Sequence, residues 1–130
     1  MNFLIKTLEE NKKFQELTKQ ISKTGPIAIS GLVDVGLIQI LTAINEFGKK
    51  PICLVTYNEI QAKKLYEDIK YFTDKVYYLP KKEIVTYDYV AESKELQYER
   101  IEILNKINEN KNVIVVTTIE AVMQKIISKK

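Results

Sequence analysis

The sequence predicts an α/β fold in which an open, mainly parallel sheet is flanked by helices. Short, uniformly apolar segments alternate along the chain with longer segments whose apolar residues recur at helical spacing. Apolar strands of this kind are typical of parallel sheets covered on both faces, and right-handed crossovers join such strands. The length of 130 residues fits one domain of ordinary size.

The N-terminal third is predicted to be mostly helical. Residues 2–22 place apolar side chains at helical spacing among lysines and glutamates. Asn11 offers a point at which this helix divides in two. A short apolar strand is predicted at 27–29, and helical periodicity returns at 33–47. Gly48 follows as the glycine that commonly ends a helix.

The rest of the chain repeats the alternation of strand and helix. Two capping boxes mark helix starts, Asn58 with Gln61 and Thr117 with Glu120. The strand at 52–56 is apolar throughout, so we expect it to be buried on both faces. The predicted elements are strand 52–56, a helix with an apolar stripe over 62–72, strand 76–79, an irregular stretch at 80–93, helix 94–109, strand 113–116, and a last helix with an apolar stripe over 119–127.

The composition excludes several kinds of site. The chain has no histidine, so it holds neither a Ser-His-Asp constellation nor a histidine-ligated metal. Its single cysteine, Cys53, forms no disulfide within the chain, and a reduced, cytoplasmic setting is expected. No apolar run reaches the length of a membrane span, so no membrane is expected as a partner. Paired carboxylates lie beside lysines on predicted helices, so no catalytic residue and no metal site are predicted.

The 20 basic residues are 19 lysines and one arginine, against 17 acidic residues, which leaves a formal net charge of +3. The lysines are scattered, and arginine is the residue suited to bidentate recognition of phosphate or guanine. We therefore expect at most weak binding to DNA. The lone Arg100 is expected to use its planar guanidinium on a carboxylate of the 80–93 stretch, such as Asp88 or Glu92.

Four tyrosines gather around the third predicted strand and the stretch that follows it: Tyr77, Tyr78, Tyr87 and Tyr89. Exposed tyrosines can stack on the bases of single-stranded nucleic acid. Tyrosines at a sheet edge more often lie half-buried in a core or a domain interface, and we favour that interpretation. Tyr87 and Asp88, together with Arg100, are therefore candidates for a structural or interface role.

The segment after the first predicted strand is the place to look for a ligand, because open α/β sheets bind ligands at the carboxyl ends of strands. Gly31 and Gly36 have the spacing of the two glycines in a phosphate loop. Leu37 replaces the lysine of that motif, Ile38 replaces its hydroxyl residue, and Asp34 would repel a phosphate. The helical spacing places Leu37 at the centre of the buried face and Ile38 on its flank. We predict a degenerate loop that binds no cofactor; an unusual nucleotide site is the alternative.

Several segments, in their order and spacing, resemble the N-terminal region of bacterial transcription-repair-coupling factors. The resemblance covers most of residues 10–127. The residues that carry it are 26–32 (PIAISGL), 55–59 (VTYNE) with Ala62 and Leu65, 79–80 (LP) with Glu83, Tyr87 and Asp88, then Ser93 and Glu95, 99–101 (ERI) with Leu104, and 113–116 (VIVV) with Thr118 and Ala121.

The resemblance implies a fold like the first domain of the excinuclease B subunit. That fold is P-loop NTPase-like or helicase-like, and here it would carry the degenerate phosphate loop. Residues 1–24 would be an N-terminal helical segment, and residues 25–130 would be the helicase-like α/β domain. The chain would then be a piece of a much longer protein and would make intramolecular contacts with later domains.

The longer protein that the resemblance implies is an ATP-dependent DNA translocase that uses ATP and Mg²⁺. It removes stalled RNA polymerase at DNA lesions and recruits the nucleotide excision repair machinery. Its expected partners are double-stranded DNA, RNA polymerase and the excinuclease A subunit, bound mainly through parts outside this chain. The chain itself is expected to be a non-catalytic scaffold domain. The alternatives are a small α/β nucleotide-binding domain with an atypical phosphate loop and an unrelated small α/β binding module.

Overall fold

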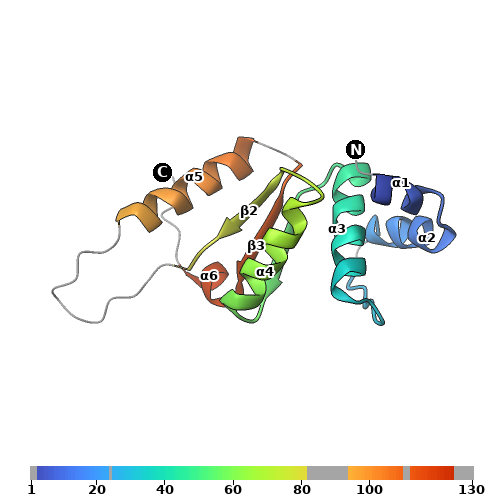
Figure 1. The fold of residues 1–130 in the computed structure, drawn as a ribbon, viewed down its shortest axis with the longest axis horizontal. Helices are drawn as coiled ribbons and strands as arrows, with labels where there is room; N and C mark the ends of the chain where they lie inside the picture. The colour runs from blue at the N-terminus through green and yellow to red at the C-terminus, as the bar shows by residue number, and fades with distance from the viewer. Residues whose placement is uncertain (1–2, 24, 82–93, 110–111, 125–130) are drawn as a thin grey trace.

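The computed structural model of the protein describes residues 3–23, 25–81, 94–109 and 112–124. Within these residues the chain forms six helices and three strands, which Figure 1 labels in chain order. The elements are α1 (Phe3–Glu9), α2 (Lys12–Ile21), α3 (Asp34–Gly48), β1 (Ile52–Thr56), α4 (Glu59–Lys70), β2 (Val76–Leu79), α5 (Lys94–Glu109), β3 (Ile114–Thr118) and α6 (Ile119–Met123).

The three strands form one open parallel sheet in the order β1-β3-β2, so the last strand in the sequence is the central one. The helices α4 and α5 cover opposite faces of this sheet (Figure 1). On one face Val116 of β3 packs in a cluster with Leu65 of α4. On the other face Val115 of β3 packs with Ile103 of α5. The predicted α/β fold with an open parallel sheet and flanking helices is thus confirmed.

The fourth strand predicted at 27–29 is wrong. Within the described chain, residues 26–30 pair with no strand, and the side chains of Ile27 and Ile29 are 38% and 49% exposed. An apolar run of three residues is short for a strand, and its β-propensity has an effect only where a neighbouring strand offers it backbone partners. The sheet therefore has three strands in place of the predicted four.

The described elements cover β1 on one face only, which corrects the expectation that it is buried on both. Ile52 and Leu54 pack against the cluster that includes α4. Cys53 and Val55 alternate with them, point to the opposite face and are exposed. β1 has this one-sided burial because it is an edge strand, whereas all five residues of the central β3 are buried.

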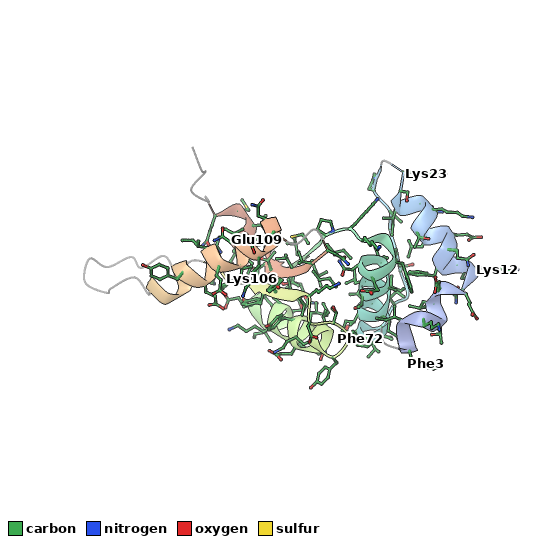
Figure 2. All side chains as sticks on the ribbon, turned by 90° about the horizontal axis from the view of Figure 1, so that it is seen from above. Phe3, Lys12, Lys23, Phe72, Lys106 and Glu109 are labelled. Carbon is green, nitrogen blue, oxygen red and sulfur yellow. The ribbon has the colours of Figure 1, made fainter. Side chains whose placement is uncertain are left out.

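The N-terminal helices pack as a group against α3 at one end of the molecule (Figures 1 and 2). The predicted break at Asn11 is confirmed, because its side-chain carbonyl accepts hydrogen bonds from the N–H groups of Lys13 and Phe14 and so caps α2. Ile5 of α1, Phe14 of α2 and Ala43 of α3 form the buried centre of this group.

Phe72, directly after α4, joins this helical group to the sheet. Its ring packs against the N-terminal cluster and against the cluster beneath α4, and Figure 2 shows it on the side of α4 that faces α3. Ile38 of α3 belongs to the cluster beneath α4 and is only 2% exposed. The N-terminal helices and the sheet therefore share one continuous core. Among the described helices, none combines the length and the apolar character that a bilayer crossing requires.

Two predicted helix boundaries are shifted by one residue. Gly48 is the last residue of α3, and it is Lys49 that takes the left-handed conformation, with φ 48°. α6 is capped by Thr118, whose hydroxyl accepts a hydrogen bond from the Ala121 N–H at 3.3 Å. The predicted cap, Thr117, belongs instead to β3, because the pairing of that strand with β1 extends to Thr118.

Candidate functional site

The carboxyl ends of the three strands lie at one edge of the sheet, where open parallel sheets bind ligands. Two hydroxyl groups at this edge hold the strand ends together. Thr56 Oγ1 donates to the Asn58 carbonyl at 2.9 Å and lies 3.2 Å from the Thr117 carbonyl. Thr117 Oγ1 donates to the Leu79 carbonyl at 3.0 Å. These threonines therefore act as structural donors between β1, β3 and β2.

A charged cluster spans the same edge, and we name Glu59, Lys81 and Glu120 the carboxyl-edge cluster. Lys81 follows β2, and its Nζ lies 3.1 Å from Oε2 of Glu120 on α6 and 3.6 Å from Oε1 of Glu59 on α4. The hydrogen bond with Glu120, followed by the charges of Glu120 and Glu59, raises the pKa of Lys81. One ammonium between two carboxylates leaves this cluster with a net negative charge, which disfavours phosphate binding.

The first turn of α4 meets the same edge. Asn58 Oδ1 accepts a hydrogen bond from the Gln61 N–H at 2.8 Å, which confirms the predicted cap. The reciprocal half of the capping box does not form, because Gln61 Oε1 is buried without a partner in the described part of the chain. Glu59 lies in this first turn, where the helix dipole stabilises a negative charge.

The predicted phosphate loop has a different setting from a nucleotide-binding loop. Gly31, with φ 79°, does not follow a strand of the described sheet, and Gly36 lies inside the first turn of α3. Asp34 Oδ2 accepts a hydrogen bond from Lys64 Nζ at 2.8 Å. That hydrogen bond, and then the charge of Lys64, lowers the pKa of Asp34. The carboxylate is thus paired with α4.

Leu37 and Ile38 exchange the positions that helical periodicity predicts for them. Ile38 is buried in the cluster beneath α4, whereas Leu37 is only partly buried. The buried face of α3 also includes Thr42, which donates to the Ile38 carbonyl at 2.8 Å, and Asn45, which donates to the Lys50 carbonyl at 2.9 Å. α3 packs against α1, α2 and α4, so its covered surface is broader than the single stripe that periodicity assumes.

Arg100 is buried where α5 meets the end of β2. Its Nη1 donates a hydrogen bond to the Pro80 carbonyl, and burial lowers the pKa of the guanidinium. The predicted carboxylate partners, Asp88 and Glu92, lie outside the described residues, as does Tyr87. An ion pair between Arg100 and one of these carboxylates stays a prediction. The Pro80 carbonyl oxygen is an acceptor that the sequence did not indicate.

Two of the four clustered tyrosines lie against the helices that cover the sheet. Tyr78 packs beside Tyr66 of α4 with 6.1 Å between ring centroids, and burial raises the pKa of Tyr78. Tyr77 lies beneath the ammonium group of Lys106 on α5, 5.6 Å from the ring centroid. These contacts confirm the core interpretation for these two residues. The other two tyrosines lie outside the described residues.

Other places in the described chain offer less chemistry. Residues 3–23, 25–81, 94–109 and 112–124 contain no group of three or more His, Cys, Asp or Glu side chains arranged to hold a metal ion. A groove of about 290 Å³ between α2 and α3 has Phe14, Ile44 and Phe47 in its lining, with Glu9 and Lys50 as its charged residues. The carboxyl edge of the sheet therefore stays the best candidate site.

No protein-family model matches the sequence, and no curated protein or solved structure is significantly similar to it. The class that the fold and the site define is an α/β protein with an open parallel sheet. A charged cluster occupies the carboxyl edge of that sheet and was not predicted from the sequence. The positions of its members could have indicated it, because Glu59, Lys81 and Glu120 each lie two or three residues after the end of a strand.

Proposed function

We propose that this chain is the non-catalytic N-terminal scaffold domain of a transcription-repair-coupling factor. Such a protein is an ATP-dependent DNA translocase that removes stalled RNA polymerase at DNA lesions and recruits the nucleotide excision repair machinery. The proposal is supported by the ordered segments between residues 26 and 121 that resemble this family. An open parallel sheet with helices on both faces is compatible with the P-loop NTPase or helicase-like first domain that the proposal requires.

The observation that carries the non-catalytic part of the proposal is the carboxyl-edge cluster. Nucleotide hydrolysis needs cations placed around the phosphates and a ligand for Mg²⁺. Lys81 is instead shared between Glu120 at 3.1 Å and Glu59 at 3.6 Å. Leu37 and Ile38, at the motif positions of the lysine and the hydroxyl, supply neither a charge nor a metal ligand. A triphosphate at this edge would therefore meet excess negative charge.

The rest of the proposal concerns the longer protein. Its motor would bind ATP and Mg²⁺, and its other parts would make most of the contacts with double-stranded DNA, RNA polymerase and the excinuclease A subunit. It would work in the cytoplasm. The helical segment 1–24 would support the α/β domain 25–130, and the packing of α1 and α2 against α3 is consistent with that role.

Two measurements test this function. The reading frame beyond Lys130 should continue into helicase motifs with an intact phosphate loop, and a stop codon directly after Lys130 would contradict the proposal. Titration of a fluorescent ATP analogue with Mg²⁺ into the 130-residue chain should give no saturable binding, and the chain should show no Mg²⁺-dependent ATP hydrolysis above a denatured control. Saturable binding would favour the small α/β nucleotide-binding domain instead.

A further inference from the structure

One face of β1 is left uncovered by the described elements. Cys53 is in register with Val115 of β3, and Val115 packs with Ile103 of α5. Cys53 and Val55 therefore point to the face on which α5 lies. α5 packs there against residues of β2 and β3, while Cys53 and Val55 are exposed, with Val55 44% exposed. Parallel strands are normally covered on both faces, so this part of β1 lacks its covering element.

The topology indicates which element belongs over β1. The connection from β1 to β2 crosses the sheet in one direction and places α4 on one face. The connection from β2 back to β3 runs in the opposite direction and places α5 on the other face, as crossovers of a single hand require. A helix that leads from β3 to a further parallel strand beside β1 would continue in the direction of the second connection. It would therefore lie on the α5 face, directly over β1.

The same argument excludes a further strand at the other edge of the sheet, which is formed by β2. A strand added beside β2 would need its crossover helix on the face that α4 already covers. The exposed face of β1 therefore matches a connection that continues past β1 and not one that continues past β2.

We propose that the face of β1 that carries Cys53 and Val55 is a docking surface for an amphipathic helix of the same polypeptide. The helix would come from the sequence that follows this piece in the longer protein, so the inference rests on the proposed function. It would continue the interface that α5 makes through Ile103 and would lie beside α5 at the usual helix spacing of about 8–10 Å. Its apolar stripe would cover Val55 and the Cys53 thiol.

Cys53 is the only cysteine in this chain and can report on the docking directly. The 130-residue chain and the longer protein encoded by its reading frame are each treated with iodoacetamide, and the peptide that contains Cys53 is quantified by mass spectrometry. We expect labelling of Cys53 to be at least about tenfold slower in the longer protein, because a covered thiol reacts only when the helix opens. Denatured samples of both proteins should react at the same rate. Equal rates in the native proteins would overturn the inference.

A pair of variants separates docking from local effects on the strand. Val55→Lys should lower the thermal midpoint of the longer protein more than that of the 130-residue chain, because only the longer protein places the lysine beneath a helix. Ile60→Lys is the matched control, since Ile60 is 83% exposed on α4, and it should leave both midpoints unchanged. An equal shift for Val55→Lys in both proteins would overturn the docking inference alone. A reading frame that stops at Lys130 would overturn the proposed function together with this inference.

Discussion

The guanidinium of Arg100 donates a hydrogen bond to the main-chain carbonyl of Pro80, and this contact links α5 to the end of β2. Arg100 is the only arginine among 20 basic residues, and among the residues whose burial the structure describes it is the one basic residue that is buried. A planar guanidinium with several donors is suited to a buried site in a way that a lysine ammonium is not. The use of arginine at this one position therefore has a structural reason.

Arg100→Met removes these donors and keeps much of the side-chain volume. We expect it to lower the free energy of unfolding by about 2 kcal/mol, because the Pro80 carbonyl loses a charged donor. Arg100→Lys should recover only part of that loss. Urea unfolding measures both variants, and Glu109→Gln, an exposed position on the same helix, should change stability by less than about 0.5 kcal/mol. A loss for Arg100→Met no larger than this control would contradict the prediction.

Ile38→Thr restores the hydroxyl of a phosphate loop at a position that the core occupies. Since Ile38 is buried, we expect a loss of about 2 kcal/mol from the missing apolar contacts and the buried hydroxyl. Leu37→Lys should cost less, because Leu37 is partly exposed and a lysine there can extend to solvent. Thermal melts of both variants and of the double variant should show no stabilisation by Mg-ATP. An upward shift with Mg-ATP would reveal a dormant nucleotide site.

Lys49→Gly is expected to stabilise the protein. Lys49 has φ 48°, which is unfavourable for a residue with a Cβ atom and is readily adopted by glycine. The gain should be about 0.5–1 kcal/mol, seen as a higher urea midpoint with an unchanged slope. The neighbouring Lys50→Gly is the control and should not stabilise, because Lys50 does not have a positive φ. Equal effects of the two substitutions would show that the left-handed conformation is not the cause.

The ion pair of Asp34 with Lys64 predicts a pH dependence. The folded protein holds the pKa of Asp34 below its ordinary value through the hydrogen bond with Lys64. The pair therefore contributes stability above the unfolded pKa of about 3.9, and this contribution is lost as the pH falls through the folded pKa. The stability difference between the wild-type protein and Asp34→Asn should shrink below about pH 4 in urea unfolding at low salt.

Lys64→Met serves as the second arm of that experiment. It removes the partner of Asp34, so the two single variants and the double variant should all lose the same pH-dependent term. Both side chains are largely exposed, so the term should be small and should weaken at high salt. A stability difference that stays constant from neutral to acid pH would show that the pair does not contribute in this way.

Binding to DNA should be weak. The lysines are dispersed, and Figure 2 shows Lys12 at the start of α2 well separated from Lys23, which follows the end of that helix. Others are paired with acidic residues, as Lys64 is with Asp34 and Lys106 with Glu102. Few phosphates would be neutralised together, so fluorescence anisotropy with labelled duplex DNA should detect no complex at physiological salt. A dissociation constant below about 1 µM under those conditions would contradict this.

The helices and three of the strands could be predicted from the sequence because the residue patterns that mark them lie within a few positions of one another. The caps at Asn11 and Asn58 are made by side chains within three residues of the groups they satisfy, so sequence spacing identifies them. The strand predicted at 27–29 fails because strand formation depends on a neighbouring strand, and sequence spacing says nothing about which edges are free.

The candidate site is less accessible to sequence analysis. Lys81 lies between Glu59 and Glu120 only because β3 inserts between β1 and β2 and brings three loops together. The Pro80 carbonyl that Arg100 binds is a backbone group and carries no mark in the sequence. Helical periodicity predicted that Leu37 is more deeply buried than Ile38, because it assumes that α3 is covered on one side only. In the structure α3 packs against α1 and α2 as well as against α4.

The strand order β1-β3-β2 also has a consequence for how the chain folds. In the sheet that the described residues form, β1 and β2 make no ladder with each other, so neither has a hydrogen-bonded neighbour there until β3, near the end of this sequence, is available. The sheet therefore depends on contacts between distant residues, and such contacts form slowly because a long loop must close first. During synthesis on the ribosome, the apolar segments of β1 and β2 would emerge well before their shared neighbour. Until then the nascent chain exposes two unpaired strands, which is the period when it is most prone to aggregation or to capture by a chaperone.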